Sequence, residues 1–168
     1  MHVLATLLLA LLTGCATMQD KATTAAAHDV ATTAAGLAAG AAEVNPLGLI
    51  TIPVKIGALA YADGLPTGER ETTQAAVAAI WTGAAANNWC VLASIASGGT
   101  LAPACIVLGL VVALKVWEGT AMERQFWMIC ASEKHGKPDL VCRYTTPVDA
   151  NDTHKATARQ AVFLRPNP

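Results

Sequence analysis

The sequence has little charge. Asp, Glu, Lys and Arg make up 14% of its 168 residues, against roughly 25% in an ordinary soluble domain. None of them lies between Glu71 and Lys115, and such a stretch is hard to reconcile with a surface exposed to water. The net charge of −1 also gives no electrostatic steering toward nucleic acid, which we therefore exclude as a partner.

The sequence also lacks the common catalytic signatures. It contains no phosphate-binding G-x-x-x-x-G-K-[ST], no dinucleotide-binding G-x-G-x-x-G, no H-E-x-x-H and no G-x-S-x-G. His28 and Asp29 are adjacent, so on a helix their side chains diverge by about 100° and form no dyad. There is no C-x-x-C, and His135 and His154 are not at zinc-ligand spacing. We predict no enzymatic activity, no catalytic residue, no metal site and no cofactor.

The first 14 residues are typical of a bacterial signal peptide, although they carry no Lys or Arg. The apolar run Val3–Leu12 is too short to span a bilayer. It leads into Leu12-Thr13-Gly14-Cys15, which resembles the lipobox of bacterial lipoproteins. This predicts a lipoprotein signal peptide at 1–14, lipidation at Cys15, and an anchor and linker at 15–24, with membrane lipid as the partner. Ala16 in place of aspartate resembles outer-membrane sorting. The alternative is an ordinary signal peptide or a buried helix with a chance cysteine.

Residues 25–118 are predicted to form four helices rich in alanine and glycine. Asn45-Pro46 ends the first, because a residue before proline avoids the helical conformation, and Pro53 should kink or divide the second. A turn at 97–100 joins the last two into an antiparallel hairpin. We expect a mainly α fold, a four-helix bundle embedded in the membrane, with helices at 25–44, 47–62, 73–96 and 101–117.

Beyond Lys115 the sequence becomes more polar. Phe126–Ser132 and Asp139–Thr145 flank a turn-like His-Gly-Lys-Pro, which predicts a short β-hairpin within an extracytoplasmic segment at 119–146. Residues 147–168 are rich in Thr, Asn and Asp and are predicted to be a polar tail, loop or partly disordered.

Four cysteines remain once Cys15 is set aside, and four allow three pairings. Cys130 and Cys142 are equidistant from Gly136, and Cys90 and Cys105 are equidistant from the 97–98 turn. Antiparallel pairing therefore favours Cys130–Cys142 and Cys90–Cys105, each worth about 3 kcal/mol in the chain-entropy model. If 101–117 spans a bilayer, however, the pairs lie on opposite sides, and an inner membrane offers only one oxidising side. Cys130–Cys142 is the firmer expectation, and Cys90–Cys105 is left open.

Polar residues within the apolar segments form a candidate buried cluster. Asp29, Thr33 and Glu43 share a helical face with Gly36 and Gly40. A carboxylate that faces lipid is costly, and Lys55 is the one basic residue among these segments, hence the natural partner. Asparagines in the third helix favour interhelical hydrogen bonds. The candidates are Asp29, Thr33, Glu43, Asn45, Lys55, Asn87 and Asn88. Their charges either mark membrane interfaces, form a structural ion pair or serve a transport or catalytic role.

A longer pattern resembles a family of small bacterial multi-span membrane proteins of unknown function. The matching residues are Asp29-x-x-Thr32-Thr33, Glu43-x-Asn45-Pro46-Leu47, Lys55 and Asn87-Asn88. The resemblance covers roughly Asp29 to Asn88 and implies a multi-span architecture without a known activity. The lipobox and the cysteine-bearing C-terminal part depart from that pattern.

These observations predict a lipid-anchored lipoprotein, bacterial or encoded by a phage, in the membrane of the cell envelope. Its carboxyl terminus would be extracytoplasmic. Its role would be structural or interactive, with another envelope protein as partner. One alternative is a lipid-tethered periplasmic helical domain that does not span the membrane. Another is a small channel or transporter for ions or protons that uses Asp29, Glu43 and Lys55.

Overall fold

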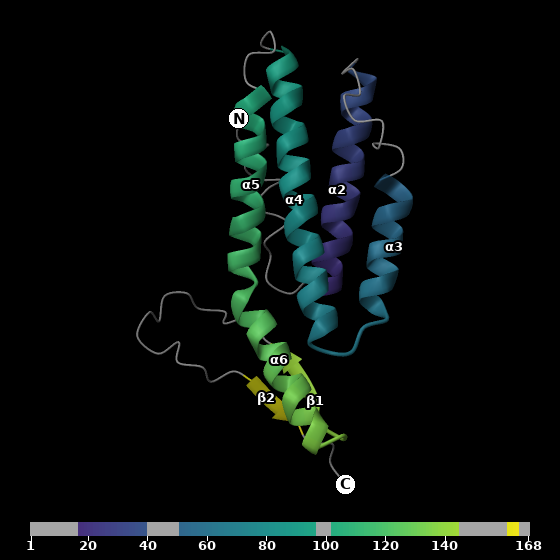
Figure 1. Ribbon diagram of the computed structural model, residues 1–168, viewed down its shortest axis with the longest axis vertical. Helices are drawn as coiled ribbons and strands as arrows, with labels where there is room; N and C mark the ends of the chain where they lie inside the picture. The colour runs from purple at the N-terminus through teal and green to yellow at the C-terminus, as the bar shows by residue number, and fades with distance from the viewer. Residues whose placement is uncertain (1–16, 40–50, 97–101, 145–160, 165–168) are drawn as a thin grey trace, which may run out of the picture.

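A computed structural model of the protein describes residues 17–39, 51–96, 102–144 and 161–164, and the predicted mainly helical fold is confirmed. Cys15, Glu43 and Asn45 lie outside the described residues. The elements, shown in Figure 1, are α2 (Met18–Ala38), α3 (Thr51–Asp63), α4 (Glu69–Ala96), α5 (Ala102–Gly119), α6 (Ala121–Gly136), β1 (Val141–Tyr144) and β2 (Ala161–Leu164).

Helices α2, α3, α4 and α5 stand side by side, with α4 in contact with each of the other three (Figure 1). Helix α6 continues beyond α5 after a bend of 45°. One end of the bundle, here called the charged end, comprises the starts of α2 and α4, the ends of α3 and α5, and α6. The Lys21–Glu123 ion pair, 2.6 Å long, joins α2 to α6 there. At the opposite end, called the far end, α4 ends and α5 begins.

Three helices begin at least four residues from where the sequence indicated, and one of them is α3, which begins at Thr51 rather than at residue 47. Helix α2 begins at Met18, inside the expected linker, and α4 begins at Glu69 rather than at residue 73. Pro53 lies in the first turn of α3, where a missing backbone N–H breaks no intrahelical hydrogen bond, so it does not divide the helix. Gly68 just before α4 has φ +93°, and a Cβ there would come within 3.0 Å of the Ala131 Cβ. Glycine therefore lets the α3–α4 turn approach α6 closely.

A capping box fixes the start of α2. The Thr17 hydroxyl accepts from the backbone N–H of Asp20, and the Asp20 carboxylate accepts from the Thr17 N–H at 3.0 Å. Thr17→Ala is expected to lower the free energy of unfolding by about 1 kcal/mol. Thr23→Ala, at an exposed mid-helix position, is the matched control and should not destabilise the protein. Thermal unfolding in detergent followed by circular dichroism measures both, and equal effects of the two changes would contradict the cap.

The predicted hairpin strand at Phe126–Ser132 is wrong, because these residues lie within α6. Glu123, Phe126 and Cys130 are buried there at helical spacing, and a short apolar run alone does not distinguish strand from helix. The second predicted strand does contain β1, but β1 pairs antiparallel with β2, Cys142 opposite Phe163. Strand β2 belongs to the C-terminal tail, which was expected to be loop or partly disordered.

The bundle interior is made of small and polar residues, whereas the large aliphatic residues point outward. Most buried hydrophobic residues are alanines, and the largest fully buried side chains are Thr32, Cys105, Cys130 and Ser94. Residues on the outer faces of α3 and α5 are strongly exposed, including Val54 at 61% and Ile106 at 62%. The exposed aliphatic residues of these two helices are Ile52, Val54, Ile56, Ile106, Val107, Leu108, Leu110, Val111 and Leu114.

Within the described ranges, one helix is long and apolar enough to cross a membrane, at Glu69–Ile95 in α4. The bent pair Pro103–Gly119 and Ala121–Gly136 would add a second if it forms one broken span. The core helix of a soluble protein meets the same criterion but is mostly buried. Here only 28% of the apolar window of α4 is buried, which is less than the core helix of a soluble protein shows.

Candidate functional site

Three helices meet at a buried polar cluster, here called the Asp29 cluster, which consists of Asp29, Thr32, Thr33, Lys55 and Asn88. Asp29 comes from α2, Lys55 from α3 and Asn88 from α4. The Lys55 ammonium forms an ion pair with Oδ2 of Asp29, and both side chains are buried. The Asn88 amide donates to the other oxygen, Oδ1, at 3.0 Å. Both oxygens of the buried carboxylate are therefore engaged by donors from two other helices.

The two threonines complete the cluster. Each hydroxyl donates to the Asp29 backbone carbonyl, at 3.0 Å for Thr32 and 2.8 Å for Thr33. Each also accepts from the Asn88 amide at 3.2 Å. Because positions 29, 32 and 33 are three and four residues apart, they share one face of α2, directed toward α4. Thr32 was not among the candidate residues, and its spacing from Asp29 was the signal that could have found it.

This arrangement is suited to holding helices together. The ammonium neutralises the carboxylate, and both carboxylate oxygens accept a hydrogen bond, which lowers the cost of keeping both charges out of water. In the described part of the chain, no group of three His, Cys, Asp or Glu side chains is placed to hold a metal ion. The chemistry of the cluster is therefore that of an interhelical connection among α2, α3 and α4.

The structure places Asn87 apart from the Asp29 cluster. Its amide reaches Asn88 at a long 3.5 Å, and its Oδ1 is buried without a hydrogen-bond partner. Asn87 lies instead at the α4–α5 contact, where a Cβ on Gly109 would come within 3.0 Å of the Asn87 Cβ. Of the seven candidate residues, Asp29, Thr33, Lys55 and Asn88 are brought together, Asn87 faces α5, and Glu43 and Asn45 lie outside the described residues.

Both favoured cysteine pairs are at disulfide distance. Cys90 of α4 and Cys105 of α5 have Cα atoms 5.2 Å apart. Cys130 of α6 and Cys142 of β1 have Cα atoms 6.2 Å apart. The first pair connects α4 to α5 near the far end of the bundle. The second pair connects α6 to the strand pair at the charged end. The second pair thus joins a helix to a strand, rather than two strands of a hairpin.

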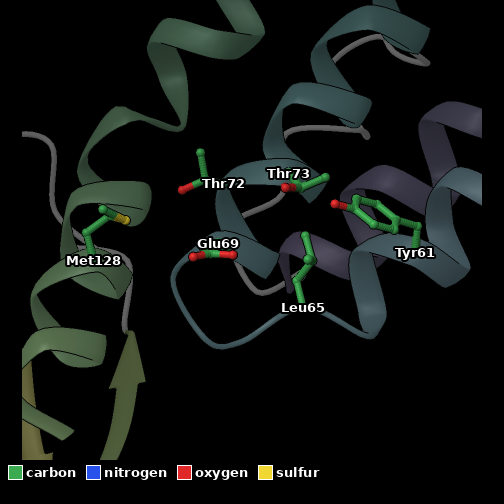
Figure 2. Close-up of a pocket in the computed structure, with 6 residues that line it drawn as sticks. All are labelled: Tyr61, Leu65, Glu69, Thr72, Thr73 and Met128. Atoms are coloured by element: carbon green, nitrogen blue, oxygen red, sulfur yellow. The ribbon is translucent and has the colours of Figure 1, made fainter. Parts of the chain in front are cut away.

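A shallow hollow of about 330 Å³ lies at the charged end, between the α3–α4 turn and α6 (Figure 2). The Tyr61 hydroxyl is directed toward Thr73, and Met128 faces the hollow from α6. The lining residues are Tyr61, Leu65, Glu69, Thr72, Thr73 and Met128, none of which the sequence singled out. Nearby, Arg124 stacks 3.4 Å over the Trp117 ring. Burial, and then the charge of Glu123, raise the pKa of Tyr144 above its usual value.

Comparison with known protein families, with curated proteins and with solved structures finds no match to this chain. The resemblance to small multi-span membrane proteins therefore stays a prediction that rests on the residues quoted above.

Proposed function

We propose that this protein is a lipid-anchored helical bundle embedded in a membrane of the cell envelope, with a structural or interaction role rather than a catalytic one. The observation that carries this proposal is the inverted distribution of side chains. A bundle in water buries Leu, Ile and Val, but here alanines and polar groups are inside and the large aliphatic residues are outside. Large aliphatic residues exposed in such number mark contact with lipid or another protein.

Helix packing of this kind is suited to a lipid environment. Lipid removes the hydrophobic drive for large side chains to gather inside, so small residues pack at helix contacts and polar residues join the helices. The contacts between α4 and its neighbours follow this pattern, with Ala75, Ala78, Ala79 and Ala85 buried on α4. The Asp29 cluster supplies the interhelical hydrogen bonds.

The dimensions and the charges agree with such an environment. Helix α4 has 28 residues and is about 42 Å long, more than the roughly 30 Å hydrocarbon core of a bilayer. Between the charged end and the far end, the described segments of the bundle carry no charged side chain except the paired Asp29 and Lys55. An ion pair that neutralises itself is the form in which charges are tolerated at membrane depth.

The predicted lipid anchor fits the same geometry. Helix α2 begins three residues after Cys15 and does so at the charged end. Acyl chains on Cys15 would then enter the same membrane interface that the charged end contacts. A channel or transporter has less support, because both oxygens of Asp29 are occupied by Lys55 and Asn88.

Extraction of membranes at alkaline pH tests the proposal. Cys15→Ala prevents acylation, and the variant should nevertheless remain in the pellet after carbonate treatment, because the apolar faces of α3 and α5 hold it in lipid. Wild-type protein is the control for anchored material, and a periplasmic protein is the control for release. Complete release of a folded, monomeric Cys15→Ala protein would contradict embedding and support the lipid-tethered, non-spanning domain.

A further inference from the structure

The two cysteine pairs lie toward opposite ends of the bundle. Cys105 is in the first turn of α5, whereas Cys130 is in α6, beyond the other end of α5. From Cys105 to Gly119 the helix rises about 21 Å, and the part of α6 that leads to Cys130 adds to this separation after its 45° bend. The distance between the pairs is therefore comparable to the roughly 30 Å hydrocarbon thickness of a bilayer.

The Cys90–Cys105 pair lies at the level expected for the far membrane interface, and the Asp29 cluster, which Asn88 joins to α4, lies just inside it. The neighbour of the pair, Trp89, is partly exposed although it is a large aromatic residue, and tryptophan is enriched at membrane–water interfaces. Trp89 follows Glu71, the last charged residue at the start of α4, by 18 positions. That interval corresponds to about 27 Å of helix, close to one hydrocarbon thickness. Cys105 is fully buried whereas Cys90 is partly exposed, so the pair would exchange with thiols of the far-side compartment through the Cys90 sulfur.

An inner membrane does not accommodate this arrangement in either orientation. Apart from the paired Lys55, the Lys and Arg residues of the described ranges lie at the charged end, the end that also holds Cys130–Cys142. The positive-inside rule would place that end in the cytosol, where a Cys130–Cys142 bond would be reduced. The opposite orientation violates the rule and places the end of the bundle that holds Cys90–Cys105 on the cytosolic side.

We propose that the bundle resides in a membrane whose two faces are both outside the reducing cytosol, as for the outer membrane of a bacterium with two membranes. This inference rests on the proposed embedding and names the class of membrane that is the partner. The positive-inside rule acts during insertion from the cytosol, so it does not constrain a chain that has been exported first. The residue after Cys15 is Ala16 rather than aspartate, which agrees with sorting to that membrane.

A single tryptic digest measures the oxidation state of both cysteine pairs. Cells are quenched in acid, free thiols are alkylated, and inner and outer membranes are separated by density before digestion with trypsin. Residues 71–115 contain no Lys or Arg before Lys115, so Cys90 and Cys105 stay in one peptide whose mass shows whether it is oxidised. Cys130 and Cys142 fall in different peptides, separated by cleavage after Lys134, and appear as one crosslinked species. We expect both bonds to be formed in protein that sediments with the outer membrane.

Two double variants test each cysteine pair separately from the other. Cys90→Ser/Cys105→Ser and Cys130→Ser/Cys142→Ser each leave one pair, and each remaining pair should resist alkylation until it is reduced. Inner-membrane location, or alkylated Cys90 and Cys105 in the wild type, would overturn this inference while leaving the embedding intact. If carbonate releases the Cys15→Ala variant with both bonds formed, the proposed embedding fails, and this inference fails with it.

Discussion

Replacing Asp29 with leucine is expected to lower the free energy of unfolding by about 3–5 kcal/mol, the cost of leaving one partner of a buried ion pair unmatched. Lys55 is buried against Asp29, so without the carboxylate its ammonium stays charged in an apolar bundle or must lose its proton. The Asn88 amide also loses one of its three acceptors and keeps the hydroxyls of Thr32 and Thr33. Lys55→Met leaves the carboxylate unmatched in the same way and should cost a similar amount. Unfolding in mixed detergent micelles measures both changes.

The double variant Asp29→Leu/Lys55→Met distinguishes an ion pair from two independent losses. Both charges are removed together, so the double variant should be more stable than either single variant. Lys115→Met is the matched control, because Lys115 pairs with Glu118 at 2.7 Å in an exposed position and such pairs contribute little to stability. Strict addition of the two single losses would contradict a coupled, buried pair.

The central part of this site could be anticipated because charges are so scarce in the apolar segments. With one lysine available, Asp29 had a single nearby candidate partner, and helical spacing placed Thr33 on the same face as Asp29. An interhelical hydrogen bond from Asn88 could be expected from the sequence. Its acceptor, Asp29, could not be predicted, because it depends on how α4 packs against α2. The spacing of adjacent residues on a helix also explains why Asn87 faces α5 instead.

Other parts of the fold depended on information that the sequence pattern does not contain. The run Phe126–Ser132 is apolar enough for a strand, but it joins with Glu123 to form one buried helical face. The pairing of β1 with β2 links segments that are far apart in the sequence, and no local periodicity predicts such a partner. The effect of Pro53 depended on where α3 begins, and helix ends are the least certain feature of a periodicity argument.

Gly83→Ala is expected to force α4 and α5 apart and to lower the free energy of unfolding by about 1–3 kcal/mol, the range for overpacking a well-packed contact. A Cβ at this position would lie 2.5 Å from the Gly109 carbonyl oxygen and 2.8 Å from the Ala113 Cβ. The nearest obstacle is backbone, which no side-chain rotation can relieve. Because Cys90 and Cys105 join the same two helices, the oxidised fraction of that pair should also fall.

Gly57→Ala is the matched control for this change. Gly57 lies within α3, and a Cβ there would meet nothing within 4 Å. Alanine at such a site should stabilise the helix by about 0.5–1 kcal/mol, since glycine loses more backbone entropy on folding. If α4 and α5 cross closely, Gly83→Ala should lower the free energy of unfolding and Gly57→Ala should raise it. Stabilisation by Gly83→Ala, with the Cys90–Cys105 bond retained, would show instead that the two helices stand further apart.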